Sequence, residues 1–378
     1  MAVRAAGGRA AALLSGVAHR GSAPGLAGCW TGRIGAKRHL LSDEVVRLQE
    51  FQQRKLAVTH QIYGDRAHYF KKLDDKIKRN DLILKDELKL LLHLCQTPEH
   101  VEVAKKAIYR YHEENRNVAF GEFRFGPLFV RLCYELGLED TAAELVRDKA
   151  LKGFFSDSTS FNIVMDMMFM KGYYETALEV LMNMRKQGVH FNKDTFTLAF
   201  AVCYKLNSPE SYRICTALLE ESHVKGNLIP RIAYCFAVAL ALRQEDIENA
   251  KSVYSRIMNT DSKICLNLKV LILLKSGAEA DLLALLTSSF VQDTLRFVKK
   301  PEFSQEVISV VQEGMGGSRP QMETALSRLQ LAGQVTEPSL DHMLCHTPHS
   351  KRKPAALLDQ RKTSRRTFRP LQSALLSE

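Results

Sequence analysis

A spacing of 35 residues recurs through the middle of this chain, and it constrains the fold more than any other feature. Three kinds of residue repeat at this distance: an aromatic, a glycine, and a small or aromatic residue further along (Phe161 and Phe196; Gly137 and Gly172; Ala142, Ala177 and Tyr212). A period of this length is typical of repeat proteins, in which each repeat is one supersecondary unit. Because one unit cannot cover both of its apolar faces, we expect consecutive units to stack.

Each unit has the pattern of a pair of helices. In "SFNIVMDMMFMKGYYETALEVLMNMRKQGVHFN", two helical stretches are separated at Lys171-Gly172, and the second closes at Gly188. Elsewhere apolar residues recur at three- and four-residue spacing, as in "EVVRLQEF" and "LILKDELKLLLHL". No stretch alternates polar and apolar residues as a strand would. The sequence therefore predicts an all-α fold, in which the repeated glycine lets the chain leave the first helix of a pair in a left-handed conformation.

The stretch from Thr159 to Asn192 resembles the pentatricopeptide repeat along its whole length. Four parts match: the Thr-Tyr-Asn start, the turn, the Glu-x-Ala-Leu core and the Met-x-x-x-Gly ending (Thr159 to Asn162; Lys171 and Gly172; Glu175 to Leu178; Met184 to Gly188). Tetratricopeptide repeats have 34 residues and a Trp near the start, whereas the single Trp here, Trp30, precedes the array. The resemblance implies a right-handed α-solenoid of stacked antiparallel helical pairs.

The pattern divides the chain into four parts. We expect a mitochondrial transit peptide, an N-terminal helical segment, an array of helical pairs and a flexible basic C-terminal tail (residues 1–42, 43–80, 81–332 and 333–378). The best repeat lies near 158–192. Flanking units run roughly over 122–156, 193–230, 231–262 and 263–290, with weaker pairs at about 81–117 and 301–332.

The first 42 residues have the composition of a targeting segment. They contain six bases and no acid, together with Ala, Gly and Ser, which is typical of a mitochondrial transit peptide. We expect cleavage between Arg38 and Ser42 and a location in the mitochondrial matrix. A disordered arm that binds acidic surfaces is the alternative.

Two further features bear on the compartment. The longest unbroken apolar run, Ile232 to Leu242, is about half the roughly 20 residues that a membrane-spanning helix needs, so we predict no membrane span. The eight cysteines are scattered without a CxxC pair. They are therefore expected to be small buried hydrophobes in a reducing compartment.

The resemblance implies binding of single-stranded mitochondrial RNA, with each repeat aligned to one base that two or three side chains read. In the best repeat the base-reading positions are Asn162 and Asn192, and in later units Thr197 and Asn267 occupy the first of these positions. Because later units depart from the repeat length and Cys235 occupies a reading position, we expect reading of one or two bases only. The alternative for Asn162 is a helix-start residue that bonds local backbone groups.

RNA affinity depends heavily on neutralising phosphates, and most of the net charge of +11 sits at the two ends of the chain. The array itself is nearly neutral, so the alternative is that it binds no RNA alone. Candidate phosphate contacts are the bases of the array and those of the tail (Lys171, Arg185, Lys186, Lys193, Arg231 and Lys275; Lys351, Arg352, Lys353, Arg365 and Arg366). A solvated terminus is the alternative for the tail.

The sequence offers no catalytic constellation. Its aspartates are dispersed, and the glycine-rich "EGMGGSRP" lacks the lysine of a P-loop. The segment "HMLCHTPH" contains His342, Cys345, His346 and His349, which are residue types that bind zinc, but their spacing does not match a zinc finger. We predict no enzyme activity, no metal and no cofactor.

Two functions fit these features. The leading hypothesis is an RNA-binding adaptor in transcript processing, maturation or stability, on which the respiratory chain depends. RNA-processing nucleases or the mitochondrial ribosome are then the expected partners. The rival is an α-solenoid that binds proteins, for example a scaffold on the mitochondrial ribosome.

Overall fold

The computed structural model describes residues 39–61, 66–115, 124–290, 300–314 and 320–346, all of which belong to one compact unit. Residues 1–38 of the predicted leader and residues 347–378 of the predicted tail lie outside the described residues.

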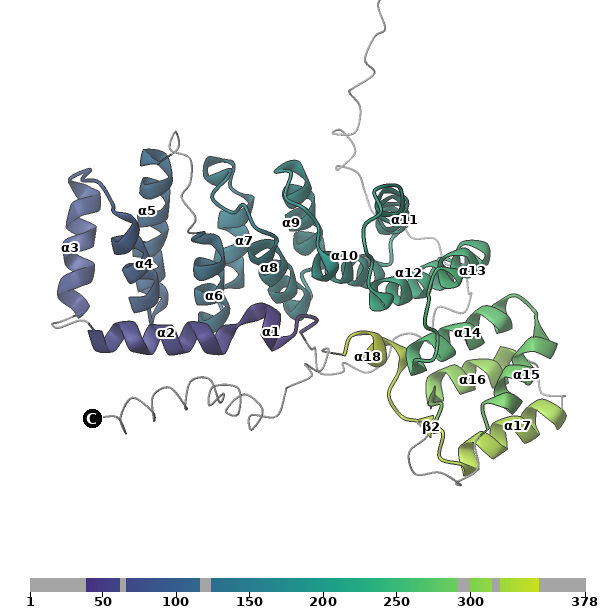
Figure 1. Ribbon diagram of the computed structural model, residues 1–378. Coiled ribbons are helices and arrows are strands. Elements are labelled where there is room, and N and C mark those ends of the chain that lie inside the picture. Colours follow the sequence, from purple (N-terminus) through teal and green to yellow (C-terminus); the bar gives the residue numbers. More distant parts are fainter. Residues whose placement is uncertain (1–38, 62–65, 116–123, 291–299, 315–319, 347–378) are drawn as a thin grey trace, which may run out of the picture. The chain divides into compact units, whose positions relative to one another are not determined.

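Consecutive antiparallel helices pair and stack in chain order (Figure 1). We call the earlier helix of each pair the first helix and the later one the second helix. The pairs are α4 (Lys85–Leu94) with α5 (Pro98–Glu114), α6 (Gly126–Leu136) with α7 (Glu139–Arg147), α8 (Ser158–Lys171) with α9 (Tyr174–Lys186), α10 (Lys193–Leu206) with α11 (Pro209–Val224), α12 (Arg231–Arg243) with α13 (Ile247–Ser255), and α14 (Lys263–Lys275) with α15 (Glu279–Ser288). A short 3-10 helix, η2 (Lys149–Leu151), follows α7. This arrangement confirms the predicted all-α fold of stacked helical pairs.

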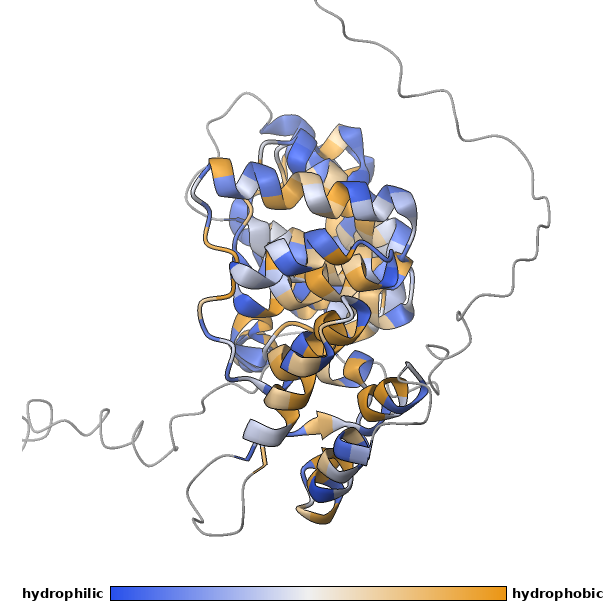
Figure 2. Cartoon of the chain, turned by 90° about the vertical axis from the view of Figure 1, so that its right-hand side faces the viewer, coloured by the Kyte–Doolittle hydropathy of each residue, from blue (hydrophilic) through white to orange (hydrophobic). Residues whose placement is uncertain are grey.

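The first helices form the centre of the stack. In α8 every residue from Ser160 to Phe169 is buried, and in α12 every residue from Cys235 to Leu242 is buried. A helix that is apolar on all sides must be surrounded, and α8 accordingly contacts α6, α7, α9 and α10. Figure 2 shows that most other helices carry both hydrophobic and hydrophilic residues, as helices at a surface do.

The N-terminal helices lie across the first helices. The segment consists of α1 (Asp43–Val46), α2 (Leu48–Gln61) and α3 (Arg66–Lys78). Helix α2 packs against α4 and α6, α1 packs against α8, and α3 packs against α5 (Figure 1). The N-terminal segment thus packs on the first helices α4, α6 and α8 and also on the second helix α5.

The C-terminal end of the fold differs from expectation in two ways. Residues 333–346, which we assigned to the flexible tail, form β2 (Val335–Thr336) and α18 (Leu340–Leu344), and Leu340, Met343 and Leu344 are buried. The fold also contains a two-residue parallel pairing of β2 with β1 (Phe303–Ser304). A pairing this short leaves no alternating pattern in the sequence, so the prediction of helices only missed it. Helix α16 (Gln305–Gly314) packs on α14, and α17 (Pro320–Leu331) packs on α15.

Glycines end several first helices in the way the repeat predicts. Gly172 and Gly277 have φ angles of 86° and 70°, in the left-handed region that residues with a Cβ atom rarely adopt. The amide of Gly277 donates to the Leu274 carbonyl, and the amide of Ala278 donates to the Leu273 carbonyl. These two bonds satisfy carbonyls that the end of α14 would otherwise leave open.

Replacing Gly277 with Ala should lower the free energy of unfolding by about 1 kcal/mol, because the left-handed conformation strains a residue with a Cβ atom. A Cβ atom there would meet nothing within 4 Å, so backbone strain is the only cost. Urea unfolding measures the change. The control is Gly277→Asn, which should cost less because Asn tolerates this conformation. Equal losses in the two variants would contradict the backbone explanation.

Candidate functional site

The structure brings together the two predicted base-reading residues of the best repeat. The Asn162 amide nitrogen donates to the Asn192 side-chain oxygen over 3.0 Å, and the Thr195 hydroxyl donates to the Asn162 oxygen over 2.8 Å. Asn192 also caps α10, since its side chain accepts the Thr195 backbone amide over 2.9 Å. Asn192 is exposed, whereas Asn162 is fully buried.

The other two predicted base-reading residues do not face solvent. Thr197 is buried, and its hydroxyl donates to the Lys193 carbonyl one turn earlier. Asn267 is fully buried: its nitrogen donates to the Glu302 carbonyl over 3.0 Å, and its oxygen accepts the Ser304 amide over 2.8 Å. Asn267 therefore anchors the segment that contains β1 to α14.

These contacts differ from the predicted arrangement of four exposed base-reading residues. Only Asn192 is exposed, and the amides of Asn162 and Asn267 are occupied within the chain. The physical reason is that a polar group inside a packed helix must be hydrogen-bonded when it is buried. Sequence spacing could not show which chain segment would supply the bond.

The predicted cations fall at two opposite ends of the first helices. At the carboxyl ends, Lys275 donates to the Leu242 carbonyl over 2.9 Å. Arg243, which the sequence analysis did not single out, donates to the Tyr204 carbonyl over 3.2 Å. Each base thus caps the preceding first helix, where a cation also interacts favourably with the helix dipole. Lys171, at the same end of α8, forms an ion pair with Glu139 that raises the pKa of the lysine.

The amino ends of the first helices carry a second set of bases. Lys193 and Arg231 are the first residues of α10 and α12. Lys186 is the last residue of the adjacent second helix α9, and Arg256 directly follows α13. All four side chains are exposed, and none has an ion pair in the part of the chain that the structure describes. We call these four residues the basic edge. Sequence reasoning missed Arg256, although its position after α13 matches that of Lys186 at the end of α9.

Other charges at this edge are already paired. Glu221 lies 2.8 Å from the Arg185 guanidinium and 2.6 Å from the Lys225 ammonium, which lowers the pKa of the Glu221 carboxyl. Asp194, beside Lys193, is half-buried, and this burial raises the pKa of its carboxyl. The cations of the basic edge are therefore the ones that remain available to a ligand.

A cavity of about 460 Å³ opens beside the basic edge, between the loop that follows α9 and the end of α11. Phe191 and Phe196 meet there edge to face, with ring centroids 5.8 Å apart, and Arg185, His190 and Lys225 line its sides. Aromatic and cationic side chains in one groove are what proteins use to bind single-stranded nucleic acid. Sequence reasoning did not single out this cavity, because its aromatic and cationic residues come from two different repeats.

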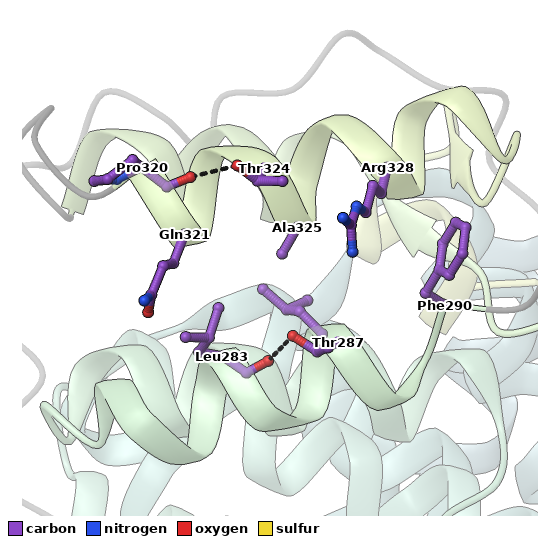
Figure 3. Close-up of a pocket in the computed structure, with 9 residues that line it drawn as sticks. Leu283, Thr287, Phe290, Pro320, Gln321, Thr324, Ala325 and Arg328 are labelled. Carbon is purple, nitrogen blue, oxygen red and sulfur yellow. Dashed lines mark hydrogen bonds between the residues drawn. The ribbon is translucent and has the colours of Figure 1, made fainter.

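A second cavity, of about 420 Å³, lies between α15 and α17 (Figure 3). The hydroxyls of Thr287 and Thr324 bond carbonyls of their own helices, so they turn away from a ligand. Arg328 is the charged residue of the lining. These walls contain no carboxylate, thiol or imidazole and carry no catalytic group.

Three further expectations concern a metal site, a membrane-spanning helix and the basic C-terminal tail. Among the residues that the structure describes, no group of three or more His, Cys, Asp or Glu could hold a metal ion, and His349 lies outside them. No helix within those residues is long and apolar enough to cross a membrane. The tail bases lie outside the described residues (Lys351, Arg352, Lys353, Arg365 and Arg366).

Because the amide of Asn162 bonds two neighbours, Asn162→Ala should lower the free energy of unfolding by about 1–3 kcal/mol, the cost of unsatisfied buried polar groups. The control is Asn227→Ala, an exposed amide whose loss should change stability by less than about 0.5 kcal/mol. Urea unfolding of both variants measures the difference. If Asn162→Ala were as stable as the control, the hydrogen bonds of Asn162 would not stabilise the fold.

The chain is similar to known proteins over most of its length. The family model described as "Mitochondrial 28S ribosomal protein S27" matches residues 30–246. The chain is 51% identical over 348 residues to pentatricopeptide repeat-containing protein 2, mitochondrial, of Homo sapiens, covering 91% of this chain and 90% of that protein. Identity to the proteins of the same name is 53% in Xenopus laevis, over 91% of each chain, and 49% in Mus musculus, over 97% of this chain and 96% of the mouse protein. The chain therefore belongs both to the family of mitochondrial pentatricopeptide repeat-containing protein 2 and to the family that the S27 model describes.

Proposed function

We propose that this protein binds single-stranded RNA in the mitochondrial matrix and acts in the processing, maturation or stability of a transcript. The observation that carries the proposal is the basic edge of Lys186, Lys193, Arg231 and Arg256. A phosphate backbone that runs along this edge meets cations from successive repeats. The relatives are named mitochondrial, which supports the compartment.

The position of two of these bases supports a role in binding. Lys193 and Arg231 are the first residues of their helices, where the helix dipole disfavours a positive charge by about 0.3–1 kcal/mol. Helix amino ends favour anions. A cation there costs the free protein stability, and a bound phosphate would offset that cost.

Asn192 and the cavity beside it are the proposed contacts to RNA nucleobases. Asn192 is the exposed member of the predicted pair, and Asn162 holds its side chain in place. Phe191 lies next to Asn192 in the chain and lines the cavity. We therefore propose recognition of one or two bases at this repeat. Thr197 and Asn267 stabilise the array and do not read bases.

The role that we propose is that of an adaptor and not of a catalyst. RNA cleavage would then belong to a partner nuclease, and the basic tail would add contacts to phosphates. Since mitochondrial transcripts encode respiratory-chain subunits, loss of the protein should impair respiration.

A second candidate function rests on a different observation. The matching family model bears the name of a mitochondrial ribosomal protein. The chain's own helices α2 and α18 also pack on first helices, α2 on α4 and α6 and α18 on α12 and α14, and so occupy surface that RNA would otherwise reach. A scaffold on the mitochondrial ribosome would fit both findings.

The double variant Lys193→Gln, Arg231→Gln separates binding from folding. It should raise the free energy of unfolding by about 0.3–1 kcal/mol for each residue, because two cations leave helix amino ends. Its affinity for a single-stranded RNA should fall. The slope of log affinity against log salt should flatten by about 1.4, which is about 0.7 for each phosphate that the variant no longer neutralises.

The control is Lys71→Gln, Lys106→Gln, which removes two exposed charges from α3 and α5. Filter binding at several salt concentrations should show the slope of the original protein in this control. Equal slopes in the two double variants would contradict RNA binding at the basic edge.

Crosslinking in intact mitochondria separates the two candidate functions. RNA recovered with the tagged protein should concentrate at one transcript junction, and Asn192→Ser should reduce that recovery while it keeps a good helix cap. Recovery of ribosomal RNA alone would favour the ribosomal scaffold. Recovery at background level would overturn RNA binding.

A further inference from the structure

A carboxylate lies in the interior of the array and is bonded by the start of the described chain. Asp166, in the middle of α8, has no exposed surface. Its Oδ1 accepts the Leu40 amide over 2.7 Å and the Leu41 amide over 3.4 Å, and its Oδ2 lies 2.8 Å from His39 Nδ1. The hydrogen bonds to Asp166 from the described part of the chain thus all come from residues 39–41.

Burying an ionised carboxylate is costly unless a positive charge is paired with it. The two backbone amides carry no formal charge. The His39 side chain is 39% exposed, and its second ring nitrogen faces the Tyr134 hydroxyl at 3.1 Å. A chain without His39 would lose this imidazole contact, and the Leu40 nitrogen, 2.7 Å from Oδ1, would be the nearest group that could replace its positive charge.

That nitrogen would become charged if the chain began at Leu40. The side chains of Leu40 and Leu41 are 4% and 3% exposed, so both leucines belong to the packed core. The residues before His39 contain six bases and no acid, the composition of a leader that mitochondria remove. Leu40 is the last residue at which the chain can begin without losing either buried leucine.

We propose that the leader is removed by hydrolysis of the His39–Leu40 peptide bond, and that the new amino terminus of Leu40 pairs with Asp166. Water adds across the bond: the leader leaves with a carboxylate on His39, and Leu40 retains an α-ammonium. This group keeps the position of the Leu40 amide and adds a full positive charge beside the buried carboxylate. Charge-assisted bonds of this kind are about twice as strong as neutral ones.

The pair would complete the fold only after the leader has gone. Residues 40 and 41 lead into α1 and α2, which pack on α8, α6 and α4. Fixing Leu40 to Asp166 therefore fixes the start of the segment that covers the first helices. The inference rests on the proposed mitochondrial leader and does not depend on RNA binding.

Intact-mass measurement and N-terminal sequencing of the protein from mitochondria test the cut. The expected first residue is Leu40. A different first residue, or an unprocessed chain inside mitochondria, would overturn this inference and leave the mitochondrial location intact. Absence of the protein from the mitochondrial fraction, with an unprocessed chain in the remaining fractions, would overturn both.

Thermal unfolding tests the ion pair. A recombinant chain that begins at Leu40 should melt at a higher temperature than a chain that begins one residue earlier with His39→Gly, because the Leu40 nitrogen of the longer chain is again a neutral amide. With Asp166→Asn in both chains, the difference should disappear. Equal melting temperatures for the two chains with Asp166 intact would overturn the pairing, and this comparison holds even if Asp166→Asn fails to fold.

Discussion

Burial of the first helices between their neighbours is the interaction on which the rest of this structure depends. Ser160 to Phe169 of α8 and Thr195 to Tyr204 of α10 are buried without a break. Each large apolar side chain among them contributes about 1.5–3 kcal/mol when fully buried. A single helical pair would leave the faces that now contact the neighbouring pairs in water, so the pairs are stable only as a stack of nearest neighbours.

Because these helices are completely buried, each of their polar groups needs a hydrogen-bond partner within the protein. For several polar groups of the first helices the partner comes from a segment far away in the sequence. Asp166 of α8 binds residues 39–41, Asn267 of α14 binds the backbone of Glu302 and Ser304, and Asp341 of α18 forms an ion pair with Lys205 of α10. The polar residues inside the stack thus determine which segments cover it.

The same arrangement sorts the positive charges by function. At the carboxyl ends of the first helices, Arg243 and Lys275 satisfy carbonyls of the preceding repeat and stabilise the array. At the amino ends, Lys193 and Arg231 have no such partner in the described residues and oppose the helix dipole. Arginine and lysine side chains therefore stabilise the fold at the carboxyl ends of the first helices and remain available to a ligand at the amino ends.

The sequence by itself determined the helical pairs, their 35-residue period and the left-handed glycines, because these follow from local periodicity and from the absence of a Cβ atom. It also assigned Asn162 and Asn192 to the two base-reading positions of one repeat, although it did not predict the hydrogen bond between them. Only the tertiary structure decided that Asn162 and Asn267 are buried and that α18 belongs to the fold. It alone decided which bases share an edge and which cap a neighbouring helix. These properties depend on contacts between residues more than 30 positions apart, such as the bond from Lys275 to Leu242, and local sequence carries no record of which distant segment will supply a partner.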